Sequence, residues 1–289
     1  MKMILLGCTG QLGQHVFSIA RERGIHVVGI TKKQLNIIDS DYTKLYNETN
    51  VDLIVNCAAY TKVDLAETES YLAYQVNHYA LNNIVDYSNK KNIPLIHIST
   101  DYVYGTTKTF KPFKEDDECN PVNIYGSSKL KGENLIRSKC SKYAIIRTSW
   151  LYSNYEFSFP NKIISILKKS GEIKVVDDQL GTPTYCSDLT EFIISVANFL
   201  LVDKVDKAIY NYSNLGNASW YDFAVSCQKA IGCKGLITPC SSEEFETKAK
   251  RQSYSKLNLT NALSVISNIR HWQDTVSDWK FNYLSNKTI

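Results

Sequence analysis

The segment KMILLGCTGQLG, residues 2–13, places a short apolar run directly before three glycines spaced G-x-x-G-x-x-G. The apolar run predicts a strand, and residues 11–24 after it carry apolar side chains at helical spacing. Gly7, Gly10 and Gly13 then occupy the turn between strand and helix. Such a turn needs glycine where the backbone approaches a pyrophosphate, whose charge is bound by free N–H groups at the helix start. A plain tight turn is the alternative, but the strand-turn-helix context favours a dinucleotide site.

The rest of the chain continues this alternation, which predicts a parallel sheet with helices on both faces. Further strands are predicted at residues 25–30, 51–59, 93–100 and 143–150, and helices at 66–90 and around 123–134. After residue 150 the rhythm weakens, with strands predicted at 173–178 and 208–214 and a helix at 188–201. We therefore expect an α/β protein, a Rossmann-type doubly wound parallel sheet with a smaller mixed α/β C-terminal substrate lobe. The boundaries predicted are 1–150 plus about 187–214 for the NAD(P)-binding domain, and about 151–186 and 215–289 for the lobe.

A last helix is predicted at residues 271–284, where four apolar side chains share one face. They are Trp272, Val276, Trp279 and Tyr283. Core packing explains such a stripe better than any cofactor role.

Composition excludes several classes of function. The net charge is +4 over 289 residues without a basic block, so no nucleic-acid partner is expected. No apolar run approaches the ~20 residues of a membrane span, and the N-terminus enters a strand pattern without the layout of a signal peptide. The eight cysteines form no C-x-x-C pair, which is typical of reduced thiols in a cytoplasmic protein.

The end of the second strand bears on which nicotinamide cofactor binds. An acidic residue there would bind the ribose 2′-hydroxyl of NAD, but the sequence reads GITKKQ at residues 29–34. Lys32 and Lys33 follow the strand, and a lysine neutralises a 2′-phosphate, which favours NADP(H). Solvated loop lysines are the alternative, and use of NAD(H) as well stays open.

A tyrosine and a lysine lie four residues apart in NIYGSSKLKGEN, residues 123–134. On a helix this spacing puts Tyr125 and Lys129 on one face, and a nearby ammonium is expected to lower the pKa of a phenol. Ser99 and Thr100 end a predicted strand, where ligands of parallel sheets bind, so a Thr100 hydroxyl is placed to hold a carbonyl oxygen. A chance Tyr–Lys pair is the alternative, but its occurrence after the glycine turn and the Ser-Thr strand end favours general acid catalysis.

These motifs together resemble the extended short-chain dehydrogenase/reductases and, within them, the dTDP-4-dehydrorhamnose reductase family. The resemblance extends from residue 3 to about 224, with a weaker match in AKRQSYSKLN further on. The matching segments are GCTGQLG, VDLIVNCAAYTKVDLAE, VN at residues 76–77, STDYVYG, NPVNIYGSSKLKGE, IRTSWLY, VVDDQLGTPTY and SWYDFA. The resemblance implies NAD(P)H-dependent reduction of the C4 ketone of dTDP-4-dehydro-L-rhamnose to dTDP-L-rhamnose, for cell-surface polysaccharide synthesis.

The resemblance also implies roles for individual residues. The catalytic set is Thr100, Tyr125 and Lys129, with Tyr125 and Lys129 also contacting the cofactor. The remaining cofactor-binding positions are Gly7, Gly10, Gln11, Leu12, Gly13, Thr31, Lys32, Asn36, Cys57, Ala58, Ala59 and Ser99. The positions implied for the sugar nucleotide are Thr61, Val63, Asp101, Tyr102, Trp150 and Arg251.

Three departures from the family pattern stand out. Asn36 stands where an aspartate near the adenine is common, which affects one hydrogen bond and leaves the chemistry intact. His15 replaces a glutamate that helps bind magnesium at a dimer contact in some members, so no metal site is predicted. The family's Arg-Pro pair reads Arg251-Gln252, which leaves open whether Arg251 binds nucleotide phosphates or lies at the surface.

Two other functions remain open from sequence alone. A nucleotide-sugar epimerase or dehydratase would use the same scaffold but recycle its bound cofactor. A regulatory subunit would bind a cofactor and a partner protein, although the intact Thr100, Tyr125 and Lys129 argue against it. The nucleotide-linked deoxy sugar and the oligomeric state, with a homodimer as one arrangement, are not decided by the sequence.

Overall fold

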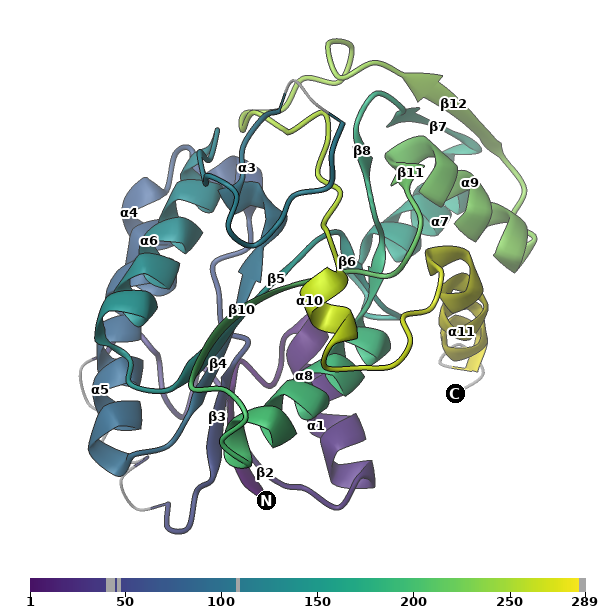
Figure 1. Cartoon of the computed structure of the whole chain (residues 1–289). Helices are drawn as coiled ribbons and strands as arrows, with labels where there is room; N and C mark the ends of the chain where they lie inside the picture. Colours follow the sequence, from purple (N-terminus) through teal and green to yellow (C-terminus); the bar gives the residue numbers. More distant parts are fainter. Residues whose placement is uncertain (40–44, 46–47, 108–109, 286–289) are drawn as a thin grey trace.

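The computed structural model describes residues 1–39, 45, 48–107 and 110–285 of the chain. Within these residues the largest element is a six-stranded parallel sheet with the order β10-β5-β4-β3-β1-β2 (Figure 1). Its strands are β1 (Lys2–Leu6), β2 (His26–Ile30), β3 (Leu53–Asn56), β4 (Leu95–Thr100), β5 (Tyr143–Thr148) and β10 (Lys207–Tyr212). The chain runs outward from β1 in both directions, so the strand order reverses between β1 and β3. Ligands of open parallel sheets bind at such a reversal, beyond the carboxyl ends of the strands.

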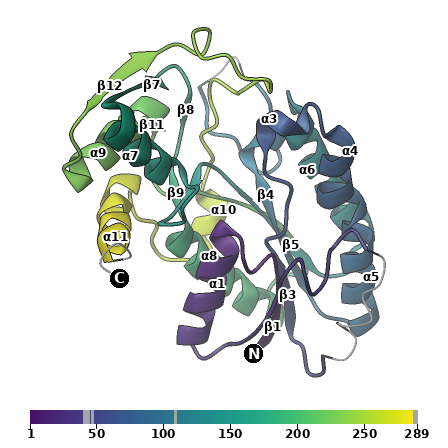
Figure 2. The ribbon, with the colours of Figure 1, turned by 180° about the vertical axis from the view of Figure 1, so that it is seen from behind.

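Alternating side chains of each strand build two cores, one on each face of the sheet. Leu5 packs in the core beneath α1 (Gln11–Glu22) and α8 (Cys186–Leu201), whereas its neighbour Ile4 packs beneath α5 (Leu81–Lys91) and α6 (Ile124–Lys139). Figures 1 and 2 show these helix pairs on opposite faces. Successive strand residues point to opposite faces, which explains why the strands are apolar throughout. The predicted Rossmann-type doubly wound sheet is confirmed.

The helix predicted at 66–90 is instead divided into shorter pieces. They are α3 (Val63–Ala66), α4 (Ser70–Tyr74), the π-helix η1 (Gln75–Tyr79) and α5. In η1 the buried amide of Asn77 accepts from the backbone N–H of Tyr60 at 2.9 Å and donates to the Tyr60 carbonyl at 3.1 Å. Turns of π-helix commonly occur at functional sites. Here the hydrogen bonds of Asn77 connect the loop after β3 to the helices. Helical periodicity in the sequence does not predict this long-range contact.

The second lobe is built from short strand pairs and helices that follow β5. Its strands are β6 (Leu151–Tyr152), β7 (Glu172–Val176), β8 (Leu180–Gly181), β9 (Thr184–Tyr185), β11 (Ala218–Ser219) and β12 (Leu236–Cys240). The pairs β7–β12 and β6–β9 are parallel, and β8–β11 is antiparallel. Two helices pack on them, α7 (Phe159–Ser170) and α9 (Trp220–Ile231). The smaller mixed α/β lobe expected from the sequence is therefore present, while its residue boundaries stay a prediction.

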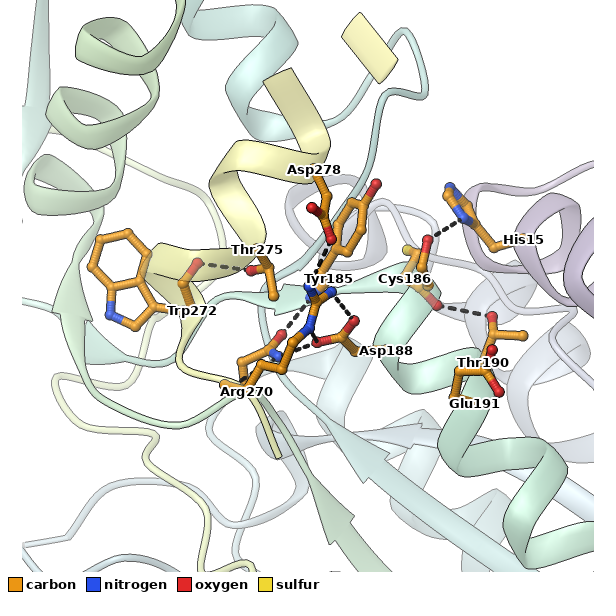
Figure 3. A network of polar contacts seen from close by, with 12 residues as sticks. His15, Tyr185, Cys186, Asp188, Thr190, Glu191, Arg270, Trp272, Thr275 and Asp278 are labelled. Atoms are coloured by element: carbon orange, nitrogen blue, oxygen red, sulfur yellow. Dashed lines mark hydrogen bonds and ion pairs between the residues drawn. The ribbon is translucent and has the colours of Figure 1, made fainter. Parts of the chain in front are cut away.

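The last part of the chain contacts one core of the large sheet and the separate core of the lobe. Ala262 of α10 (Thr260–Leu263) packs in the core of the large sheet, whereas Trp279 of α11 (Trp272–Ser285) is fully buried in the lobe. The four side chains of the predicted C-terminal stripe all lie in the core of the lobe, which confirms core packing. Between α10 and α11, Arg270 lies between Asp188 of α8 and Asp278 of α11 (Figure 3). The lobe is thus joined to the large domain by a charged contact as well as by apolar packing.

Candidate active site

A cleft of about 660 Å³ lies beyond the carboxyl ends of β1, β3, β4 and β5, and it collects most of the predicted site residues. It is lined by every predicted catalytic residue and by all predicted cofactor residues except Thr31. Among the predicted substrate positions, only Arg251 is not part of this lining. The phenol of Tyr125 and the glycine turn therefore share one cleft, as the sequence predicted.

The glycine turn closes at the point where the strand order reverses. Gly7 has φ +76°, and a Cβ there would lie 2.6 Å from the backbone nitrogen of Ala58, which follows β3. A Cβ on Gly13 would lie 2.1 Å from the Gly7 carbonyl oxygen. Gly10 is the N-cap of α1, and the first residues of that helix line the cleft, where their N–H groups lack partners within the helix. Glycine is required here by close backbone approach, and the cradle fits a pyrophosphate.

The adenosine end of the cleft is bounded by residues at and after the end of β2. Lys32 and Asn36 line it together with the apolar side chains of Leu35 and Ile37. Thr31 instead donates its hydroxyl to the Gln34 side chain at 2.8 Å, which stabilises the turn. Lys32 is exposed, so its ammonium is free to meet a 2′-phosphate at the cleft rim.

Thr100 and Tyr125 are positioned by the end of β4 and the start of α6. Thr100 is the N-cap of η2 (Asp101–Val103) and donates its hydroxyl to the Asp101 carboxylate at 3.0 Å. The N-cap of α6 is Asn123, whose side-chain oxygen accepts from the Gly126 N–H at 2.8 Å. A Cβ on Gly126 would lie 2.4 Å from the Tyr102 carbonyl oxygen, so glycine lets α6 approach η2 closely. This approach brings the Tyr125 phenol to the Thr100 hydroxyl.

The ionisation of Tyr125 differs from the sequence prediction. Burial raises the pKa of Tyr125 to about 12, the hydrogen bond with Thr100 opposes this rise, and Asp101 adds to it. The expectation that Lys129 lowers the pKa of this phenol is therefore wrong for the protein's own groups. The side-chain nitrogen of Lys129 lies 3.1 Å from His97 Nε2 and 2.7 Å from the Ile98 carbonyl oxygen. A high pKa keeps Tyr125 protonated at neutral pH, which is the form that donates a proton.

Lys129 itself is buried, with 1% of its surface exposed. Burial lowers the pKa of Lys129 to about 8, while Glu133 and Cys57 oppose this shift. The same burial raises the pKa of the Cys57 thiol to about 12, so the thiol is uncharged at neutral pH.

Behind the cleft lies a buried ion pair that the sequence reasoning missed. Arg147 on β5 donates to Glu133 on α6 at 2.7 Å, and both side chains are almost fully buried. Glu133 also accepts from the Ser99 hydroxyl at 2.5 Å, and Arg147 donates to the Tyr104 hydroxyl at 2.9 Å. The pair joins α6 to the ends of β4 and β5, and so holds the helix that carries Tyr125 and Lys129. A Glu and an Arg 14 residues apart give no local pattern from which the contact could be predicted.

The opposite end of the cleft contains the predicted sugar-nucleotide positions. Trp150 has φ +44° and stacks on Trp220 of α9 with ring centroids 3.7 Å apart. Burial raises the pKa of Asp101 to about 7 against hydrogen bonds with Ser255 and Thr100 that lower it. Thr148 lies opposite Thr100 in the sheet, and its buried hydroxyl oxygen has no hydrogen-bond partner among the described residues. A buried polar atom of this kind in a cleft indicates a ligand contact.

Arg251 lies apart from the lining, in contact with α3. It donates to the Asp64 carboxylate at 2.7 Å and to the Ala249 carbonyl at 3.0 Å. Its neighbour Gln252 is buried and donates to the Asp101 carbonyl at 3.1 Å. The described geometry thus ties this segment to the substrate end of the cleft, although Arg251 is engaged by Asp64.

The sequence reasoning also missed several residues that line the cleft. They are Leu6, Thr9, Ile30, Leu35, Ile37, Tyr60, Leu72, Val76, Ile98, Thr148, Ser149, Leu151, Tyr155 and Phe157. Most of them lie at strand ends or in the loops that follow. This position in the sequence is a signal from which their place in the cleft could have been predicted. Tyr155 and Phe157 come from the loop between β6 and α7, whose place at the cleft depends on the tertiary fold.

Neither a metal cluster nor a membrane helix is found in the part of the chain that the structure describes. Within it no group of three His, Cys, Asp or Glu side chains is arranged to hold a metal ion. His15 contacts the Ser187 hydroxyl at 3.0 Å. None of the described helices has the length and apolar character needed to cross a bilayer.

Comparison with known proteins agrees with this geometry. A family model described as the RmlD substrate binding domain matches residues 1–283. The chain belongs to the RmlD substrate binding domain family. The resemblance inferred from the sequence motifs is thereby confirmed, since curated relatives of this chain include dTDP-4-dehydrorhamnose reductases.

Relatives of this RmlD-family chain match it over most of its length. It is 34% identical to the spore coat polysaccharide biosynthesis protein SpsK of Bacillus subtilis, over 96% of each chain. It is 33% identical to the dTDP-4-dehydrorhamnose reductase of Mycolicibacterium smegmatis, over 96% of this chain and 84% of the relative. A crystal structure of dTDP-4-dehydrorhamnose reductase from Bacillus anthracis in complex with NADP superimposes with a TM-score of 0.91, at 33% identity, over 97% of this chain and 99% of that one.

Proposed function

We propose that this protein reduces the C4 ketone of dTDP-4-dehydro-L-rhamnose to the alcohol of dTDP-L-rhamnose, with NADPH as the hydride donor. The observation that carries the proposal is the joining of Thr100 and Tyr125 with the glycine turn in one cleft. Membership of a family whose curated relatives are named dTDP-4-dehydrorhamnose reductase supports the substrate. The product is a precursor of cell-surface polysaccharide.

The cofactor is assigned by the groups that bound the cleft. The N–H groups at the start of α1 fit a pyrophosphate. Gly7 approaches the Ala58 backbone so closely that no side chain fits between them. Lys32 at the rim favours a 2′-phosphate, in keeping with the NADP named for the Bacillus anthracis relative. NADPH, when bound, supplies the hydride. We also propose some use of NADH, because the exposed Lys32 is the one side chain assigned to the 2′-phosphate that distinguishes NADPH from NADH.

The chain's own residues then handle the proton. When the substrate binds, the Thr100 hydroxyl turns from Asp101 to donate its hydrogen bond to the ketone oxygen, which fixes that oxygen beside Tyr125. Tyr125 remains a phenol at neutral pH because burial raises its pKa, so it donates its proton as negative charge develops on that oxygen. Lys129 stays within the cleft wall and orients the cofactor's ribose. Trp150, held by stacking on Trp220, bounds the sugar end and excludes water.

The test is an assay of purified protein against a panel of nucleotide-linked 4-keto sugars, each with NADPH and with NADH. We expect oxidation of one NADPH per alcohol formed, fastest with dTDP-4-dehydro-L-rhamnose. A sugar product without consumption of reduced cofactor would instead indicate an epimerase or dehydratase. Absence of ketone reduction combined with tight binding to another protein would indicate a regulatory subunit.

The matched variant for this assay is Tyr125→Phe, which removes one oxygen from the cleft. We expect kcat to fall about 10²–10⁴-fold because the general acid is lost, while the Kd for NADPH stays within a few fold. Tyr71→Phe is the control, since its ring is exposed and lies outside the cleft lining. Near-normal turnover of Tyr125→Phe would refute the assignment of the proton donor.

Two further statements belong to the same proposal. We place the reaction in the cytoplasm, where NADPH is regenerated and where the eight unpaired cysteines would remain reduced. We also propose a homodimer, which light scattering of the purified protein would test by its molar mass.

A further inference from the structure

Residues 248–255, which we call the strap, connect the second lobe to α3 of the large domain. The two oxygens of the Asp64 carboxylate on α3 bind two groups of the strap. Oδ1 accepts from the Ala249 backbone N–H at 3.1 Å, and Oδ2 accepts from the Arg251 guanidinium at 2.7 Å. Arg251 also donates to the Ala249 carbonyl at 3.0 Å, so one carboxylate holds both residues together.

The other end of the strap belongs to the lobe and contacts the residue that follows Thr100. The Ser255 backbone N–H donates to the Leu180 carbonyl of β8 at 2.8 Å. The Ser255 side chain forms a hydrogen bond with the Asp101 carboxyl group, and Gln252 donates to the Asp101 carbonyl at 3.1 Å. The strap therefore binds both the side chain and the backbone of a residue at the substrate end of the cleft.

The start of α6 is held by α3 and by the strap together. Glu67, the C-cap of α3, accepts from the Ile124 backbone N–H at 2.9 Å. Asn123, the N-cap of α6, donates its side-chain amide to the Lys250 carbonyl at 2.9 Å. The first turn of the helix that carries the assigned proton donor thus has one support on α3 and a second on the strap.

The strap lies behind the cleft wall and is not part of it. Among the residues that the structure describes, the lining includes Val63, Asp101 and Tyr102 but no residue of the strap. Burial raises the pKa of Tyr102 and Arg251 opposes this rise, so the guanidinium lies close to that ring. A group in this place acts on a ligand through the wall that it supports.

The ion pair between Asp64 and Arg251 is partly open to water. The two side chains are 45% and 19% exposed. Burial raises the pKa of Asp64, but the hydrogen bonds from Arg251 and Ala249 outweigh it, so the pKa lies below its usual value and the group is a carboxylate at neutral pH. Water screens a pair of this exposure, so it adds little to the stability of the whole protein. Its effect is instead local, on the position of the strap.

We propose that Asp64 is a positioning residue, which holds the strap behind Asp101 and Tyr102 and so keeps the substrate end of the cleft ready for a nucleotide sugar. The choice of ligand rests on the proposed function. Asp64 contacts neither substrate nor cofactor in this scheme. Without it, only a fraction of the molecules has the wall in place, and the apparent Kd rises by the inverse of that fraction. The strap contacts described above all lie at the substrate end, so binding of NADPH should not change.

The first test needs no substrate. Hydrogen exchange followed by mass spectrometry compares the unaltered protein with Asp64→Ala and Asp64→Asn. We expect residues 250–255 to exchange faster in Asp64→Ala, while β1 and β3 keep their protection. Asp64→Asn should be intermediate, because its amide oxygen can still accept from Ala249. Unchanged exchange of residues 250–255 in Asp64→Ala would overturn the inference.

The control for both tests is Glu191→Gln, which alters a carboxylate of nearly the same exposure. Glu191 is 46% exposed, pairs with Arg23 at 2.8 Å and lies outside the cleft lining. It should leave both the exchange of the strap and the kinetic constants unchanged.

The second test separates binding of the nucleotide sugar from the chemical step. If the strap of Asp64→Ala is in place for a tenth to a third of the time, the KM for dTDP-4-dehydro-L-rhamnose should rise about 3–10-fold. The Kd for NADPH should stay within about twofold. We expect kcat to change less than KM, because Glu67 still holds the first turn of α6.

Three kinetic results would overturn the inference. A lower kcat with an unchanged KM would assign Asp64 to the chemical step, and an equal weakening of NADPH binding would indicate general damage to the fold. A lower KM would mean that Asp64 withholds Arg251 from the nucleotide. If the unaltered protein reduces no ketone, the proposed function has failed, and hydrogen exchange still decides whether Asp64 holds the strap.

Discussion

At the residue scale, the site depends on charged and polar groups that are fully removed from water. Such groups are stable only when each has a partner, because burial without one costs free energy. Arg147 and Glu133 satisfy this condition through three hydrogen bonds to each other, at 2.7, 3.0 and 3.1 Å. Burial should lower the pKa of Arg147, but Glu133 raises it above its usual value, so the guanidinium stays charged. The ion pair therefore holds α6 in a fixed position against the sheet.

Removal of one partner should show how much this ion pair contributes to the free energy of unfolding. We expect Arg147→Met to lower the free energy of unfolding by about 3–5 kcal/mol, because it leaves the Glu133 carboxylate buried and unpaired. Urea unfolding followed by circular dichroism measures this change. The control is Arg23→Met, which breaks an exposed ion pair with Glu191 at 2.8 Å and should leave the unfolding midpoint nearly unchanged.

A double variant distinguishes an unpaired charge from lost packing. Glu133→Gln combined with Arg147→Met leaves no buried charge at this place, so it should be more stable than Arg147→Met alone. If the double variant is as unstable as the sum of the two single changes, the cost lies in packing and the argument from the unpaired carboxylate fails.

Local sequence patterns predicted which residues share the cleft better than they predicted its electrostatics. The glycine turn, Thr100 and Tyr125 were found because each belongs to a motif within a strand-helix unit. The pKa of Tyr125 was predicted in the wrong direction because burial of the phenol raises it, while the Lys129 side-chain nitrogen contacts His97. The partner of Lys129 lies 32 residues away on β4, a contact that exists only once the sheet has formed.

At the element scale, the main difference from expectation is the helical region between β3 and β4. Apolar spacing predicted one helix over 66–90, whereas the chain forms several pieces with a π-helical turn at η1. The cause is tertiary, since Asn77 binds Tyr60 in the loop after β3 and also donates to Ser128 of α6 at 3.0 Å. The strands, by contrast, fell close to their predicted ranges because the central ones, β1, β3, β4 and β5, are largely apolar runs buried on both faces.

The packing of η1 on α6 depends on one glycine in the middle of a helix. A Cβ on Gly132 would lie 2.2 Å from the Asn77 carbonyl oxygen, closer than any real contact. Alanine normally stabilises a helix relative to glycine by about 0.5–1 kcal/mol. Here we expect Gly132→Ala to destabilise the protein by about 1–3 kcal/mol, because η1 must move away from α6. Thermal unfolding measures the change.

The control for this prediction lies two residues further along the same helix. Asn134 is exposed, so Asn134→Ala should improve helix propensity and leave stability equal or slightly higher. If Gly132→Ala also stabilises the protein, then η1 moves away without cost and the close approach is not a constraint.

At the scale of the whole molecule, the cleft needs both the large sheet and the second lobe. Lys32 and the glycine turn come from the large domain, whereas Trp150 is held by Trp220 of the lobe. The lobe is joined to α8 through Asp188, which binds Arg270 and also accepts from Asn214 at 2.6 Å. Figure 3 shows Arg270 reaching both Asp188 and Asp278 from the segment just before α11.

This arrangement makes Arg270 the link whose loss should loosen the C-terminal helix without unfolding the sheet. In Arg270→Met, Asp188 keeps Asn214 but loses its cation, and we expect a loss of about 1–3 kcal/mol because charge-assisted hydrogen bonds disappear. Hydrogen exchange followed by mass spectrometry should show faster exchange in residues 272–285 than in β1 and β3, whose protection should persist. Asp278→Asn, which alters only the half-exposed outer partner, should have a smaller effect. Equal acceleration in the sheet and in α11 would mean that the two parts unfold together, and the contact would then stabilise the whole molecule rather than the docking of the helix.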